Sequence, residues 1–438
     1  MTSIRDLVEA RLETVDTLDS ALHALITVLD EQALRQADRL DAATGPQGAL
    51  HGLPVTIKDN IDVAGVVSTA GSAHHGGERA TADATATRLL REAGAVVLAK
   101  NNMAEFAMGV TGRNDAFGDC RNARDDTRIS GGSSSGSAVA VASGMCAASL
   151  GTDTGGSGRI PAAVNGIVGV RPTLGRVSNA GVFPVSPSFD AVSPMAVDVR
   201  TAAAVLAALD WWDPADPTSV DADRIPVESA LGGAAGLRIG VPANAFFDDV
   251  DPGVATVLEP VPGALREVCG EQRRVKIPDV EIAQDRMLEV MYPEAAAVHE
   301  QRVRLRPDTI DPDVLRRIRL GQEIPAELAG RSRQWRGEFQ RRVDEVFTEV
   351  DVIATPTIPV DVPRRAAVDL ADSTRSIARF TYVWSMYGGP SVSVPCGRHP
   401  DSGMLIGLQL TAARWQDHLA LGAALAVEEL GTEDLAAG

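Results

Sequence analysis

Two glycine–serine clusters stand close together in this chain, GGSSSGSAVAVASG at residues 131–144 and GTDTGGSGRIP at residues 151–161. The run AVAVASGMCAASL that joins them is apolar and predicts a buried helix followed by a strand. A flexible Gly/Ser linker has no reason to contain such a segment. A phosphate-binding loop needs a lysine where Ser137 stands. The clusters therefore favour a place where serines do chemistry.

Short Val- and Ile-rich segments alternate with helical ones around these clusters. This alternation is typical of an α/β layer architecture. Helices are expected over the first forty or so residues, at 82–95 and across about 280–348, and a surface connection at 210–236. Strands are expected at residues 54–57, 96–100, 237–243, 350–357 and 391–397, with a further apolar strand soon after residue 58.

Composition excludes several classes of function. The 438 residues include 41 basic and 59 acidic ones, a net charge of -18, which disfavours binding to nucleic acid. No segment is apolar over the roughly 20 residues that span a bilayer, and the charged start MTSIRDLVEA is unlike a signal peptide. The four cysteines have no CxxC spacing, so no metal site is expected. A cytoplasmic protein without membrane contact is the expectation.

One serine fits a different hydrolase pattern. Residues 132–136 satisfy G-x-S-x-G, the nucleophile elbow of α/β-hydrolases, with Ser134 as nucleophile. His299, His399 or His418 could then supply the base. An elbow must follow a hydrophobic strand, however, and the preceding segment is RNARDDTRIS. This esterase alternative stays open.

Amide hydrolysis needs an activated hydroxyl, donors for an oxyanion and an acid for the leaving nitrogen. The loop DTGGS at residues 153–157 can present successive backbone N–H groups around Ser157 because its glycines let the chain curl tightly. Ser133 can relay a proton between Ser157 and a base. These residue types in this order point to acyl transfer.

Lysine occurs only at positions 58, 100 and 276, and arginine supplies the rest of the basic residues. Lys58 lies in the apolar strand LPVTIKDNI, where burial would favour the neutral amine that a base requires. The plainer alternative is an ion pair with Asp59 or Asp62 at the end of the strand.

The chain resembles the amidase signature family, serine hydrolases with a cis-Ser–Ser–Lys triad. The resemblance extends over essentially the whole chain, from HGLPVTIKDNIDVAG (51–65) and AKNNMAEFAMG (99–109) through the two serine clusters to VDVIATPTIP (350–359), GGPSVSVPCG (388–397) and GLQL (407–410). It implies an α/β/α sandwich whose central mixed, twisted sheet is covered by helices on both faces. It also implies a single domain, residues 1–438, with a signature core at about 50–200 and a helical elaboration at about 280–348.

The resemblance assigns a role to each motif residue. Ser157 becomes the acylated nucleophile, Ser133 the bridging serine after a cis peptide bond, and Lys58 the base. The remaining motif residues are the backbone amides of the oxyanion hole, at Thr154, Gly155, Gly156 and Ser157, and the structural supports Asp153, Arg159 and Ser134. No metal or organic cofactor is implied.

The implied activity is hydrolysis of the C–N bond in small amides, with carbamates, ureido compounds and esters as further substrates. Parts of the motifs are similar to the allophanate hydrolase branch, whereas NNMAEFAMG is similar to glutamine-hydrolysing amidotransferase subunits that work with a partner. A homodimer is a further expectation. The segment SMYGGPS (385–391) and Gly158 depart from the usual pattern. Side chains expected to line the substrate pocket are Met103, Phe106, Tyr387, Phe117 and Phe183.

Overall fold

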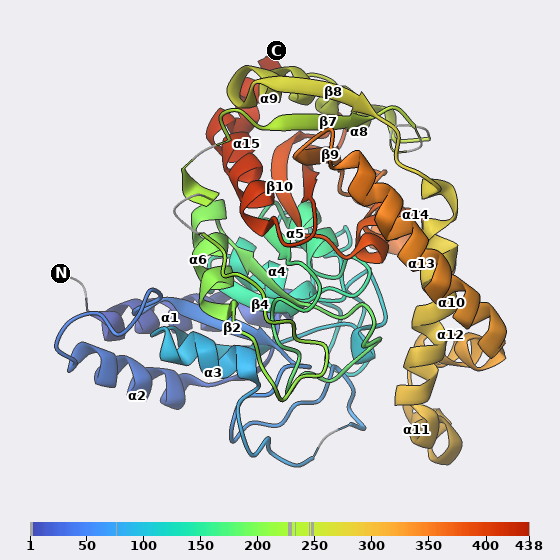
Figure 1. The fold of residues 1–438 in the computed structure, drawn as a ribbon. Coiled ribbons are helices and arrows are strands. Elements are labelled where there is room, and N and C mark those ends of the chain that lie inside the picture. The colour runs from blue at the N-terminus through green and yellow to red at the C-terminus, as the bar shows by residue number, and fades with distance from the viewer. Residues whose placement is uncertain are drawn as a thin grey trace.

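An eleven-stranded mixed sheet runs through the molecule in the order β1-β3-β2-β4-β6-β5-β10-β11-β9-β7-β8 (Figure 1). The computed structural model describes residues 3–75, 77–226, 230–232, 234–244, 246 and 249–437. The strands are β1 (Leu25–Val28), β2 (Pro54–Lys58), β3 (Val96–Asn101), β4 (Ala148–Thr152), β5 (Val168–Arg171), β6 (Val192–Ala196), β7 (Arg238–Pro242), β8 (Glu271–Val275), β9 (Val352–Pro356), β10 (Ser391–Arg398) and β11 (Leu405–Ala412).

Helices cover both faces of this sheet. On one face lie α3 (Thr85–Glu92), α6 (Val199–Leu209), α8 (Pro252–Leu258), α9 (Val261–Cys269) and α15 (Asp417–Ala437). On the other face lie α1 (Ile4–Leu22), α2 (Asp30–Asp41), α4 (Ser135–Ala142), α5 (Arg159–Asn165), α10 (Val280–Val298), α12 (Pro312–Glu323), α13 (Ala326–Val346) and α14 (Leu370–Tyr387), with α11 (Glu300–Leu305) beyond α10. The α/β sandwich implied by the resemblance is confirmed.

Alternation along the strands divides the core between the two faces. Val97 of β3 packs with Val55 and Ile57 of β2 in the cluster under α3 and α6. Val96 and Leu98 of the same strand instead join the cluster formed with α1, α2 and α4. Successive strand side chains point to opposite faces, so an uninterrupted apolar run fills both layers.

The parallel pairing of β2 and β4 positions the two clusters of motif residues. Ile57 lies beside Leu150 in this pairing, so the carboxyl ends of both strands meet at the same edge of the sheet. Lys58 ends β2 there and Thr152 ends β4. In α/β sheets this edge is the usual place for a ligand.

The expected strands at 54–57, 96–100, 237–243, 350–357 and 391–397 are found at these places as β2, β3, β7, β9 and β10. The predicted helix at 82–95 is confirmed as α3, and the helices predicted in 280–348 are confirmed as α10 to α13. Figure 1 shows α10 to α13 in yellow to orange beside the sheet.

Two sequence predictions are wrong. The first forty residues are not all helical, because His23 adopts a left-handed conformation (φ 50°) that ends α1, and β1 then pairs antiparallel with β3. The apolar strand expected after residue 58 does not form. Ile61 makes only an isolated bridge to Val182, and Gly65 turns the chain at φ 77°.

Candidate active site

Lys58 has a completely buried side chain at the end of β2. Its Nζ donates hydrogen bonds to Ser133 Oγ at 2.8 Å and to Thr152 Oγ1 at 2.7 Å. Burial lowers the pKa of Lys58 from 10.5 to about 7, although the charges of Asp153 and Asp190 favour the protonated form. Near neutral pH a large fraction of this lysine is therefore a neutral amine that can accept a proton.

The alternative ion pair of Lys58 with Asp59 or Asp62 does not form. Asp59 lies 3.2 Å from Lys100 Nζ, and both side chains are completely buried. Asp62 accepts a hydrogen bond from Ser68 Oγ at 2.7 Å. Lys100 is thus the lysine held by a carboxylate, whereas Lys58 faces hydroxyl groups.

The two serine clusters bond to each other beside Ser133. The peptide bond between Gly132 and Ser133 is cis, and the Ser133 carbonyl accepts from Ala104 N at 3.2 Å. The next residue, Ser134, donates its backbone N–H to the Ser157 carbonyl at 3.2 Å. Ser157 follows β4 and lies 9% exposed at a cavity. Ser133, which accepts from Lys58, is thus directly followed by a residue that bonds to Ser157.

The loop after β4 carries the backbone N–H groups assigned to an oxyanion hole. Those of Thr154, Gly155 and Ser157 have no hydrogen-bond partner among the described residues, and all three residues line the cavity. The N–H of Gly156, in contrast, donates to Asp153 Oδ1 at 2.9 Å. The assignment of Gly156 to the oxyanion hole is therefore corrected: its donor is already used inside the loop.

Asp153 holds this loop in shape. Its carboxylate accepts from the backbone of Gly156, Gly158 (3.2 Å) and Arg159 (3.3 Å), and in bidentate fashion from the Arg159 guanidinium at 2.9 Å on each oxygen. Burial alone would raise the pKa of Asp153, but Arg159 and Arg171 hold it well below its usual range. Arg159 is itself completely buried and reaches Gln409 Oε1 at 2.7 Å. These two side chains therefore tie the loop after β4 to α5 and β11.

Ser134 is not placed as a nucleophile. Its buried hydroxyl donates to the Thr152 carbonyl at 3.0 Å and accepts from the Thr152 N–H at 3.2 Å, which ties the end of β4 to the start of α4. His299 instead contacts Arg302, and His399 contacts Asp251. Among the described residues no histidine is bonded to Ser134, so the geometry does not support the α/β-hydrolase alternative.

A small cavity of about 40 Å³ adjoins Ser157. Its walls come from the loop after β3, the loop after β4, the segment before β6, and helices α10, α12 and α14. They are formed by Ala107, Met108, Gly109, Val110, Thr154, Gly155, Ser157, Val185, Met291, Tyr292, Arg317, Thr374 and Tyr382. The phenol oxygens of Tyr292 and Tyr382 have no hydrogen-bond partner among the described residues, so they are available to a ligand. The cavity suits a compact group with polar atoms.

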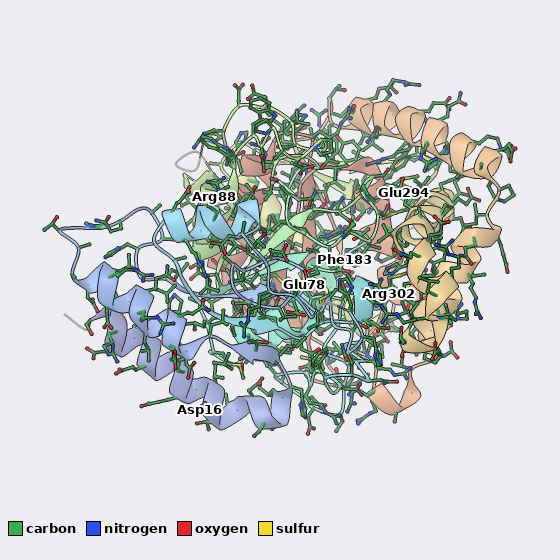
Figure 2. All side chains as sticks on the ribbon, turned by 90° about the horizontal axis from the view of Figure 1, so that it is seen from below. Asp16, Glu78, Arg88, Phe183, Glu294 and Arg302 are labelled. Atoms are coloured by element: carbon green, nitrogen blue, oxygen red, sulfur yellow. The ribbon has the colours of Figure 1, made fainter. Side chains whose placement is uncertain are left out.

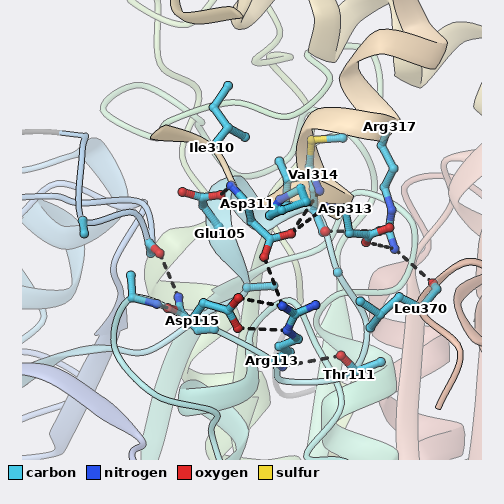
Figure 3. A pocket seen from close by; sticks show the side chains of 18 of the residues that line it. Glu105, Thr111, Arg113, Asp115, Ile310, Asp311, Asp313, Val314, Arg317 and Leu370 are labelled. Carbon is cyan, nitrogen blue, oxygen red and sulfur yellow. Dashed lines mark hydrogen bonds and ion pairs between the residues drawn. The ribbon is translucent and has the colours of Figure 1, made fainter. Parts of the chain in front are cut away.

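A wider cavity of about 350 Å³ continues from the small one and shares Met108, Gly109, Val110, Arg317 and Thr374 with it. Figure 3 shows Glu105, Asp115, Asp311 and Asp313 gathered around Arg113 and Arg317 in its wall. Arg317 pairs with Asp313 at 2.7 Å and donates to the Met108 carbonyl at 3.1 Å. We call this cavity the vestibule, since it is the larger space beside the Ser157 cavity.

Three side chains expected in the substrate pocket lie elsewhere. Met103, Phe106 and Tyr387 are completely buried, and none of them lines either cavity. Tyr387 is held in the core, where its hydroxyl donates to Asp344 Oδ1 at 2.7 Å. These assignments are corrected, because all three side chains pack into the apolar core.

Phe106 belongs to an aromatic cluster away from the Ser157 cavity. Its ring and that of Phe183 pack around the Arg302 guanidinium, 4.5 Å and 5.9 Å from the ring centroids, and Figure 2 shows Phe183 beside Arg302. His75 and His299 contact the same arginine. Neither Phe183 nor Phe117 lines the cavities, so these two expectations are corrected as well.

Sequence reasoning missed the residues that close the cavity from the helical side. Tyr292, Arg317 and Tyr382 come from α10, α12 and α14, more than 130 residues beyond Ser157 in the chain. No local pattern marks them, because each sits in an ordinary amphipathic helix. Asp190, whose charge acts on Lys58, was missed because it lies in the irregular segment between β5 and β6, which carries no recognisable pattern.

Within the described ranges, no group of three or more His, Cys, Asp or Glu side chains is arranged to hold a metal ion. No helix in the part of the chain that the structure describes combines the length and apolar character that crossing a membrane requires.

Comparison with known proteins places this geometry in a family. The sequence profile named Amidase matches residues 6–421. The AtzE subunit of the 1-carboxybiuret hydrolase from Pseudomonas sp. (strain ADP) is 34% identical, over 98% of this chain and 96% of that protein. The A-type subunit of the glutamyl-tRNA(Gln) amidotransferase from Koribacter versatilis is 35% identical, over 96% and 94%. An inhibitor-bound complex, described as a vestigial protein complex that reveals the evolutionary origins of an s-triazine catabolic enzyme, superposes with a TM-score of 0.92 at 32% identity, over 98% of this chain and 96% of that one.

Proposed function

Because this chain belongs to the Amidase family, we propose that it cleaves the C–N bond of small amides through an acyl-enzyme on Ser157. That it is an amidase-signature hydrolase of C–N bonds follows from the family itself. The observation that carries the finer proposal is the buried Lys58, whose pKa is lowered to about 7 and whose Nζ donates to Ser133 Oγ at 2.8 Å. The loop after β4 adds three backbone N–H groups without a partner among the described residues.

In the first half-reaction, neutral Lys58 accepts a proton from Ser133 as Ser133 accepts the proton of Ser157. Ser157 Oγ then bonds to the carbonyl carbon, and the carbonyl oxygen becomes an oxyanion. The N–H groups of Thr154, Gly155 and Ser157 stabilise that charge. When the C–N bond breaks, the proton returns through Ser133 to the nitrogen, which leaves as an amine or ammonia.

In the second half-reaction, a water molecule takes the place of the departed nitrogen. Lys58 again draws a proton through Ser133, the water oxygen bonds to the acyl carbon, and the Ser157 ester bond breaks. The proton returns to Ser157 and the carboxylic acid is released. The released acid is carbamic acid for a ureido substrate and a carbonic acid monoester for a carbamate whose C–N bond is cleaved. The cycle needs no redox partner.

The Ser157 cavity limits the acyl group of the substrate. A volume of about 40 Å³ accommodates a compact acyl group, with the hydroxyls of Tyr292 and Tyr382 as polar contacts. The guanidinium of Arg317 is already paired with Asp313, so it contributes mainly hydrogen-bonding capacity and little free charge. We therefore place small amides, carbamates and ureido compounds ahead of bulky aryl amides.

A second candidate is a glutamine-hydrolysing protein that works with a partner. The names of two relatives favour it, since each of them is one subunit of a larger enzyme, a hydrolase in one case and an amidotransferase in the other. Such a protein would show weak glutaminase activity on its own and would copurify with another chain. A homodimer without a second protein would instead favour the free-standing enzyme.

The test is an assay of the purified protein against primary amides, anilides, carbamates, ureido acids, glutamine and esters. Ser157→Ala is the decisive variant, and Ser143→Ala is the matched control, because the Ser143 hydroxyl bonds to the Val139 carbonyl of its own helix, outside both cavities. We expect turnover of a small amide or carbamate that Ser157→Ala abolishes and Ser143→Ala retains. Turnover that survives Ser157→Ala refutes the proposal, and turnover of glutamine alone favours the partner-dependent protein.

A further inference from the structure

Asp190 is a buried carboxylate between β5 and β6 that the reaction scheme does not use. It is 6% exposed. One oxygen accepts from Thr154 Oγ1 at 2.6 Å, and the other accepts from the backbone N–H groups of Val185 and Ser186, both at 2.9 Å. Every contact is therefore with a hydroxyl or an amide, and no ion pair within 4 Å includes Asp190 among the described residues.

The residues that Asp190 holds are walls of the Ser157 cavity. Thr154 begins the oxyanion loop, and Val185 faces it from the segment before β6. A single carboxylate thus links two chain segments that are about thirty residues apart and that both contact a bound acyl group under the proposed function. Moving either segment would change the position of the Thr154 N–H.

Asp190 also stands in a small set of buried charges. Asp190 lies at the end of β4 that Lys58 also contacts: Lys58 Nζ donates to Thr152 Oγ1 at 2.7 Å, and the Asp153 N–H donates to the carbonyl of Ala191, the residue after Asp190, at 2.8 Å. The charges of Asp153 and Asp190 both favour the protonated form of Lys58. Arg171 faces Asp190, but its guanidinium already lies 3.1 Å from Asp153 Oδ1 and donates to the Phe189 carbonyl at 2.8 Å. Asp153 is neutralised by two arginines, which leaves Asp190 as the less compensated negative charge near Lys58.

We propose that Asp190 is a positioning residue that fixes the oxyanion loop through Thr154 and strengthens Lys58 as a base through its negative charge. This inference rests on the proposed function of Lys58. Burial raises the pKa of Asp190 to about 6, while its hydrogen bonds favour the ionised form, so the carboxylate is charged at and above neutral pH. The negative charge favours the protonated form of Lys58, and a base of higher pKa binds the transferred proton more strongly.

Asp190→Asn isolates the charge. An asparagine can turn its oxygen toward the N–H groups of Val185 and Ser186 and its NH₂ toward Thr154 Oγ1, which can accept as well as donate. The hydrogen-bond pattern is then kept while the charge is lost. Thr154→Val is the matched control, because it removes one hydrogen bond to Asp190 and leaves the carboxylate in place.

The chain has only three lysines, so lysine side-chain NMR can follow Lys58 directly in the whole protein and without substrate. Lys58→Met assigns its resonance. We expect the titration midpoint of Lys58 to fall by about one pH unit in Asp190→Asn, as for the loss of a nearby opposite charge, and to stay at its wild-type value in Thr154→Val. An unchanged Lys100 resonance shows that each variant is folded.

Two results would overturn the proposal: a Lys58 midpoint that Asp190→Asn leaves in place, or an equal shift in Thr154→Val. Should Asp190→Asn not fold, the wild-type titration decides, because protonation of Asp190 must produce a second inflection of the Lys58 resonance near pH 6. Its absence refutes the coupling. Once a substrate is known, the midpoint pH on the acid side of the kcat/KM profile must decrease in Asp190→Asn. Thr154→Val must lower kcat without changing that midpoint. A failure of Ser157→Ala to abolish turnover would refute the proposed function separately.

Discussion

Replacement of Lys58 by methionine should inactivate the protein and, at neutral pH, make it more stable. The lysine is completely buried and lacks a carboxylate partner within ion-pair distance among the described residues. Its pKa falls from 10.5 to about 7 on folding. At about 1.4 kcal/mol per pH unit, the lost stability is about 4 kcal/mol at pH 7, where the folded lysine is half protonated, and it approaches about 5 kcal/mol at lower pH.

The sign of this effect follows from where the proton binds. Above pH 10.5 the lysine is neutral in both folded and unfolded chains, so its charge costs nothing. As the pH falls toward 7, the unfolded chain binds the proton and the folded chain does not, so the wild type loses stability until the folded lysine titrates as well. Methionine removes this pH-dependent loss but also removes two hydrogen bonds, worth about 1 kcal/mol each.

The expected net gain of Lys58→Met is about 2 kcal/mol at pH 7, and it should shrink to zero by about pH 9. Urea unfolding followed by tryptophan fluorescence at both pH values measures it. Lys276→Met is the matched control, since Lys276 is exposed and its replacement should change the free energy of unfolding by less than about 0.5 kcal/mol at either pH. A Lys58→Met protein that is less stable than the wild type at pH 7, with a difference independent of pH, would refute this interpretation of Lys58.

Three further outcomes follow from the same geometry. For the wild type, kcat/KM should rise with pH through about 7 as Lys58 becomes neutral, and a profile flat from pH 5 to 9 would contradict a lysine base. Gly156→Ala should lower the melting temperature and the activity together, because Gly156 has φ +131° and an added Cβ would lie 2.2 Å from Thr381 Oγ1. A variant with the wild-type melting temperature and activity would show that the loop is less tightly fixed. Arg159→Met should cost about 3–5 kcal/mol in urea unfolding by leaving Asp153 uncompensated, and a cost below about 1 kcal/mol would mean that Arg171 alone suffices.

The sequence predicts the parts of the site that lie in continuous motifs. Lys58 ends a strand flanked by apolar residues, and the two serine clusters lie on either side of a helix–strand unit, so their shared edge of the sheet follows from parallel pairing. The scarcity of lysine made position 58 conspicuous. Local pattern and chemistry agree at these residues, which is why they could be identified without a structure.

The parts that the sequence does not predict depend on tertiary contacts. The donor of Gly156 is used by Asp153, and only the curled loop brings these two groups together. Tyr292 and Tyr382 reach the cavity from helices that are distant in the chain. The sequence around them does not distinguish them from Tyr387, which is buried in the core. A short edge strand such as β1 was likewise hidden between two helices. Aromatic residues near a motif are therefore weak predictors of a pocket wall.

An acyl-enzyme on Ser157, formed with Lys58 as base, can be trapped and identified. The protein is incubated with a small aryl carbamate, and the modified residue is identified by intact mass and peptide mapping. We expect one acyl group on the peptide that contains Ser157, absent in Ser157→Ala and formed far more slowly in Lys58→Met. An acyl group on Ser134, or labelling that Lys58→Met leaves at the wild-type rate, would contradict it.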